Sequence, residues 1–130
     1  MDKQAKIYTL LSFVVLLVVE IFGRSFDLYF FVPWLGMLAH AIAGVFLAFL
    51  TIYFLISIGA FNLGRYGFFL TQIVVLVSAL IFEVGQFLFN LFRPYKVNDF
   101  SDTFLDIIFV LLGGIFAYSL FYFLEKDDDK

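Results

Sequence analysis

The side chains able to do chemistry in this chain are few, and they recur at helical spacing. Glu83 and Gln86 are three residues apart and Asn90 follows four residues later, which places all three on one face of a helix. Asp102 and Asp106 are four residues apart and share a face in the same way. Carboxylates and amides on such faces suit proton transfer, binding of a polar headgroup or ligation of a metal ion.

His40 is the only histidine, and Gly44 and Ala48 follow it on its own helical face. Small residues at this spacing let two helix backbones approach closely. Arg93 follows the Glu83 face and is placed to pair with a carboxylate. We expect the polar faces to converge in one pocket. The ligand-binding candidates are His40, Glu83, Gln86, Asn90, Arg93, Asp102 and Asp106. The catalytic candidates among them are His40, Glu83, Asp102 and Asp106. The candidate metal ligands are His40, Glu83 and Asp106.

The composition shows what kind of element must hold these residues. Of the 130 residues, 64% are hydrophobic and 15% are charged, against about 45–50% and about 25% in an ordinary soluble domain. A chain this small buries only about two-thirds of its surface, so most of these side chains must face lipid. This excludes a soluble enzyme and a disordered chain, and the net charge of -3 argues against nucleic acid as a partner.

Four apolar stretches are long enough to cross a bilayer, which needs about 20 residues of helix. We expect these spans at about 7–22, 35–59, 68–92 and 101–124, joined by short connections. Residues 1–130 then form a single integral membrane domain with a charged tail at 125–130. The predicted fold is all-α, a four-helix transmembrane bundle with both termini on the same side.

Basic residues set the expected orientation, because cytoplasmic loops carry the excess of Lys and Arg. Five lie on the side of the termini: Lys3, Lys6, Arg65, Lys126 and Lys130. Three lie on the other side: Arg24, Arg93 and Lys96. We therefore expect a multi-pass protein of the cell membrane with both termini on the cytoplasmic side. The ionisable groups within the spans all lie in the half opposite the termini, so the polar pocket is expected to face outward.

Some of these side chains have a simpler structural interpretation. Asp99, Ser101 and Asp102 lie where they would cap the fourth span, because acidic and hydroxyl side chains suit the positive end of a helix dipole. Asp106 is too deep for that role.

Three more alternatives stay open at this point. Glu20 lies four residues from Arg24 and is interpreted as an interfacial partner of it. The face that runs from Glu83 to Asn90 suits hydrogen bonding between helices as well as chemistry. His40 taken alone is typical of a packed histidine, and its polar neighbours favour a functional role.

The order and spacing of the motifs resemble those of the VanZ-like integral membrane proteins: His40-Ala-Ile-Ala-Gly44, Glu83-Val-Gly-Gln86, Arg93, Asp102-Thr-Phe-Leu-Asp106 and Gly113. They are also similar to YjdF-type relatives, in which an Asp-x-x-x-Asp pair precedes a glycine by a similar spacing. The resemblance covers residues 33–118. VanZ proteins usually have Asn at the position of Asp106 and Gly at that of Phe109, so the YjdF-type branch is the closer one.

The resemblance implies a role in the cell envelope, since VanZ-like proteins are associated with lowered susceptibility to glycopeptide antibiotics. From the residues themselves, we expect a small multi-pass protein whose pocket binds a lipid headgroup or another amphiphile. The first alternative is a membrane-embedded enzyme, metal- or acid/base-dependent, acting on a lipid-linked substrate. The second is a proton or ion pathway. No cofactor is expected outside the metal alternative, and a homo-oligomer stays open.

Overall fold

The computed structural model describes residues 1–32, 34–91 and 100–128, and the described elements are all helical. Four helices are long and apolar enough to cross a membrane, which confirms the predicted all-α bundle of four candidate spans. A fifth helix is a single turn. The helices are α1 (Asp2–Ser25), α2 (Leu28–Phe31), α3 (Trp34–Ser57), α4 (Arg65–Leu91) and α5 (Phe100–Asp128).

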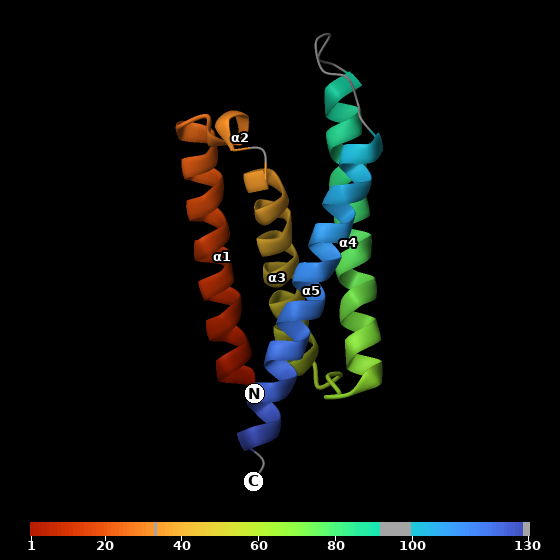
Figure 1. Ribbon diagram of the computed structural model, residues 1–130. Helices are drawn as coiled ribbons and strands as arrows, with labels where there is room; N and C mark the ends of the chain where they lie inside the picture. The colour runs from red at the N-terminus through yellow and green to blue at the C-terminus, as the bar shows by residue number, and fades with distance from the viewer. Residues whose placement is uncertain (33, 92–99, 129–130) are drawn as a thin grey trace.

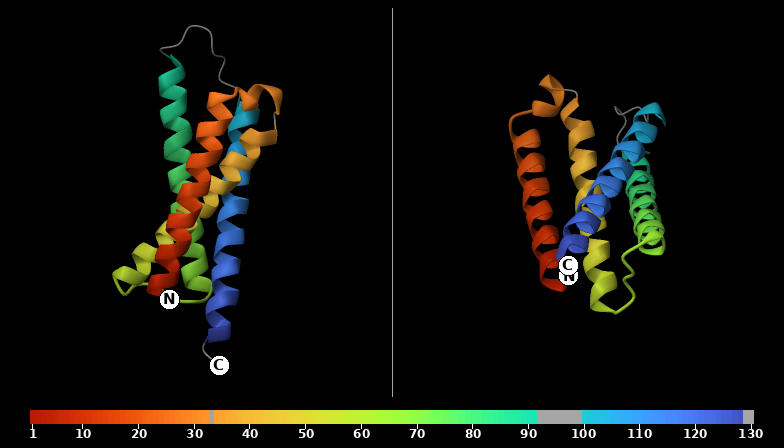
Figure 2. Two further views of the ribbon diagram at one scale, coloured as in Figure 1. Left: turned by 90° about the vertical axis from the view of Figure 1, so that its left-hand side faces the viewer. Right: turned by 60° about the horizontal axis from the view of Figure 1, so that its bottom comes forward.

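The centre of the bundle is the crossing of α3 and α5, and α1 and α4 lie on opposite sides of α3 (Figures 1 and 2). Glycines determine how closely α3 and α5 approach. A Cβ on Gly44 would overlap the Val110 carbonyl, and a Cβ on Gly113 would overlap the Ala41 carbonyl. The two backbones therefore touch, as expected for small residues in membrane helices, where close van der Waals packing drives association.

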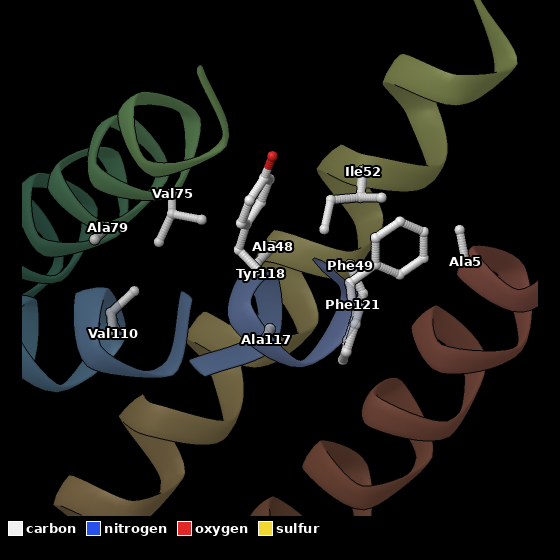
Figure 3. Close-up of a cluster of buried hydrophobic side chains, with 10 residues drawn as sticks. All are labelled: Ala5, Ala48, Phe49, Ile52, Val75, Ala79, Val110, Ala117, Tyr118 and Phe121. Atoms are coloured by element: carbon white, nitrogen blue, oxygen red, sulfur yellow. The ribbon is translucent and has the colours of Figure 1, made fainter. Parts of the chain in front are cut away.

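Side chains from all four long helices form the hydrophobic core (Figure 3), and its fully buried members lie in the half of the bundle nearer the two termini. Ala48 and Ile52 of α3 and Ala117 and Phe121 of α5 are fully buried there. Tyr8 of α1 extends this cluster, with its ring edge-on to Phe121. Edge-to-face aromatic pairs add favourable packing beyond the area that they bury, so this end is well packed.

Both chain ends lie at one end of the bundle (Figure 1). The Met1 amine is 3.3 Å from a carboxylate oxygen of Glu125, whose side chain is only 6% exposed. Glu125 is part of α5, which continues to Asp128, so the predicted charged tail at 125–130 begins as helix. The ion pair favours this extension because it neutralises a buried carboxylate.

Candidate functional site

The parallel crossing of α3 and α5 brings His40 beside Asp106. Both helices run away from the same end of the bundle, and Gly44 contacts Val110 at their crossing. His40 precedes Gly44 by four residues and Asp106 precedes Val110 by four, so each lies one turn before the contact on the same face. The Nε2 atom of His40 is 3.3 Å from Oδ2 of Asp106, with the side chains 21% and 15% exposed.

Glu83 of α4 completes a three-residue cluster with His40 and Asp106. One possible ligand atom from each of the three side chains lies within 4.8 Å of the other two. Glu83 is 9% exposed, which is unusually buried for a carboxylate. Ala79, one turn before it, is also buried and continues the face predicted for this span. The structure thus brings together the three residues predicted as metal ligands.

Two members of the cluster, His40 and Glu83, lie on the wall of a cavity of about 430 Å³ between the helices, a size within the usual range of about 300–1,000 Å³ for ligand pockets. All four long helices contribute to its lining, and most of the lining is apolar. The apolar members include Leu16, Ala39, Ala43, Phe46, Leu47, Ala79, Phe82, Ile107 and Val110, and the polar ones are Glu20, Arg24, His40, Ser78 and Glu83.

A second polar group lines the same cavity from α1. Arg24 donates from Nε to Oε2 of Glu20 at 2.9 Å, and the Tyr29 hydroxyl donates to Oε1 of Glu20 at 3.0 Å. Burial, assisted by the hydrogen bond to Glu20, raises the pKa of Tyr29 to about 12. The predicted proximity of Glu20 and Arg24 is confirmed, but the sequence interpretation placed them at the interface and missed their place in the cavity. The signal for it was an acidic residue inside an otherwise apolar run.

The other predicted site residues do not join the cluster in the part of the chain that the structure describes. Gln86 is exposed on α4, in a region where the neighbouring side chains are also exposed. Asp102 is exposed in the first turn of α5, where its charge suits the helix dipole. The Asn90 side chain and Arg93 lie outside the described residues. Their roles as ligand-binding residues stay predictions.

Two further polar side chains lie in the opposite half of α4, nearer the termini. The Thr71 hydroxyl and the Gln72 amide are buried without a hydrogen-bond partner among the described residues. Gln72 faces Gly114 of α5, where a Cβ would come within 2.9 Å of its Oε1 atom. The ionisable groups of the cavity, in contrast, all lie in the other half of the spans.

Comparison with known proteins assigns the family. Residues 4–127 match a family described as predicted membrane protein, DUF2238. The chain belongs to this family. The match to the DUF2238 family covers nearly the whole of this chain. It confirms the YjdF-like relationship that the motifs indicated. No curated protein and no solved structure matches the chain. The four candidate spans of this DUF2238 protein agree with a multi-pass membrane protein.

Proposed function

We propose that this DUF2238 protein binds a single amphiphile, such as a membrane lipid, with its polar headgroup at the cluster of His40, Glu83 and Asp106. The observation that carries the proposal is a cavity with apolar walls that reaches this cluster. An amphiphile matches this arrangement of apolar walls and a polar end, because its chain gains from apolar contact and its headgroup needs polar partners.

The cost of burying these groups supports a binding role. Ionisable side chains within membrane helices are expensive, so they face protein or water and mark functional sites. Helix packing alone does not need them, since small residues already bring α3 and α5 together at Gly44 and Gly113. The carboxylates of Glu83 and Asp106 therefore have a role other than joining the helices.

The proposal includes an orientation and a biological setting. Both termini face the cytoplasm and the cavity opens toward the outer half of the membrane, following the distribution of basic residues. The resemblance to VanZ-like proteins supports a function in cell-envelope modification or in resistance to glycopeptide antibiotics. A homo-oligomer is compatible with this arrangement.

Photo-crosslinking tests the proposal. We expect a phospholipid with a diazirine on its acyl chain, in nanodiscs, to label the lining of the cavity in the purified protein. Ala43→Phe places a ring in the cavity and should remove this labelling. Val77→Phe adds the same ring on an exposed face of α4 and should leave it unchanged. Peptide mapping of the wild type locates the label independently, and a label confined to the outer surface of the bundle contradicts the proposal.

A second candidate is an enzyme that acts on a lipid-linked substrate. It is favoured by the pairing of His40 with Asp106 at 3.3 Å beside Glu83, since an imidazole held by a carboxylate suits general acid/base catalysis. The test is to incubate the protein with a total membrane lipid extract and to compare the lipids before and after. Loss of one species with the wild type but not with Asp106→Asn supports the enzyme, and unchanged lipids count against it.

A further inference from the structure

We propose that His40, Glu83 and Asp106 bind one divalent transition-metal ion, of the zinc or manganese type. The free coordination position of this ion faces the cavity and accepts an anionic oxygen, such as a phosphate oxygen, from the bound headgroup. The metal site stands by itself, whereas its headgroup ligand rests on the proposed function.

The distances between donor atoms carry the first step. Two ligands on one zinc ion, each about 2.1 Å from the metal in a tetrahedral arrangement, are ~3.4 Å apart. The Nε2 atom of His40 and Oδ2 of Asp106 are already 3.3 Å apart. A carboxylate oxygen of Glu83 lies within 4.8 Å of both, so a small side-chain rotation completes the set.

Charge balance carries the second step. Glu83 and Asp106 place two carboxylates close together in a part of the molecule surrounded by apolar side chains. Charges of like sign in such a place are costly unless a cation neutralises them. A protonated His40 would supply only one positive charge, while a divalent ion balances both carboxylates and is bound by neutral imidazole. The Arg24 guanidinium is already paired with Glu20.

The arrangement of the helices carries the third step. Each ligand comes from a different helix, α3, α4 or α5, as in helical bundles that hold metal ions through inward-facing side chains. Three protein ligands leave a coordination position open, which is the pattern of sites that bind an exogenous ligand. The open direction is supplied by the cavity, which His40 and Glu83 both line.

Metal analysis of the detergent-purified protein tests the site without any amphiphile. The protein is stripped with chelator and titrated with Zn²⁺ and with Mn²⁺, and we expect the wild type to bind about one ion per chain. Asp106→Asn and His40→Gln should lower the affinity at least ~10-fold, because each removes a ligand. Asp27→Asn is the control: the same change at an exposed position just before α2, where the side chain makes no capping hydrogen bond. It should bind like the wild type.

Cobalt substitution keeps the test decisive if a variant misfolds. Co²⁺ bound to the wild type through an imidazole and two carboxylates gives ligand-field absorption bands that report nitrogen and oxygen ligands. Helical circular dichroism and gel filtration identify variants that remain folded. The absence of a stoichiometric ion in the wild type overturns the proposal, as does equal loss of binding in Asp27→Asn and Asp106→Asn.

Repeating the photo-crosslinking with metal-free and metal-loaded protein separates the two proposals. With a phosphate-bearing lipid probe, we expect loading to increase the labelling of the cavity. Labelling that Ala43→Phe removes, in a protein that binds no metal, leaves the proposed function standing and overturns the metal site. If the protein binds metal but the labelling is the same with and without it, the headgroup is not a ligand of the metal. If the protein binds metal but no label appears in the cavity, the proposed function is overturned and the metal site stands.

Discussion

Tyr29 shows how a single hydroxyl connects the short helix α2 to the cavity. Its hydroxyl donates to Glu20, which also accepts from Arg24, so one carboxylate is held by two partners on the cavity wall. Burial and this hydrogen bond raise the pKa of Tyr29 from 10.0 to about 12. The neutral phenol is therefore favoured in the folded protein over a wider pH range than in the unfolded chain.

A pH dependence of stability follows from Tyr29. Below pH 10 the phenol is neutral in both states, so its contribution to the free energy of unfolding is fully present. Between pH 10 and about 12 only the unfolded chain ionises, and the contribution is lost as the pH rises through the folded pKa. Thermal unfolding of wild type and Tyr29→Phe in detergent should show a smaller decline above pH 10 in the variant. Identical declines would contradict this.

Tyr118 is expected to stabilise the opposite end of the bundle. Its hydroxyl donates to the Gly64 carbonyl at 2.8 Å and accepts from the Gly64 N–H at 3.1 Å, which ties α5 to the connection before α4. Tyr118→Phe leaves both backbone groups without this partner and should cost roughly 0.5–1.5 kcal/mol per lost hydrogen bond. A lower melting temperature in detergent checks this. Tyr66→Phe, at a side chain 67% exposed, should change it little.

Single residues were predictable where burial itself is the signal. Ionisable side chains are costly inside a span, so the sequence alone marked three of them as functional candidates before the structure showed them close together: His40, Glu83 and Asp106. The role of Glu20 was not predictable in this way, because a position near a helix end also fits an interfacial ion pair. Gln72 lies outside the predicted site, in the half of its span nearer the termini, and only the packing of α5 shows that its amide is buried.

At the scale of helices, the α3–α5 crossing is expected to be the least tolerant contact. Gly44→Ala adds a Cβ that would overlap the Val110 backbone, so the helices must separate at a cost of roughly 1–3 kcal/mol. Gly36→Ala is the matched control on the same helix, since a Cβ there would meet nothing within 4 Å. The melting temperature should fall in the first variant only. Metal affinity should fall with it, because His40 and Asp106 move apart.

The helices themselves were predictable from hydropathy, because an apolar run of about 20 residues crosses the bilayer as a helix, which satisfies its own backbone within lipid. Their ends were less so. Helix α1 begins at Asp2, before the apolar run predicted as the span at about 7–22, and Asp2 suits the positive end of the helix dipole. The crossing partner of Gly44 could not be predicted, because small residues indicate close packing without naming the helix that supplies it.

At the scale of the whole molecule, the predicted orientation can be tested through introduced cysteines, because the chain has none of its own. Ser25→Cys and Asn62→Cys place a thiol at exposed positions near opposite ends of the bundle. A membrane-impermeant maleimide should label Ser25→Cys in intact cells, and Asn62→Cys only after permeabilisation. The reverse pattern would show that the cavity opens toward the cytoplasm.

The glycine contacts between α3 and α5 hold two residues of the cluster more firmly than the third. His40 and Asp106 lie on helices whose backbones touch one turn away, so their relative position is fixed by close packing. Glu83 is carried by α4, where Ile81, Phe82 and Val84 around it are exposed and little packing opposes a small displacement. Glu83 is therefore the member of the cluster that can move most easily. A ligand that binds all three residues is therefore expected to shift α4 rather than α3 or α5.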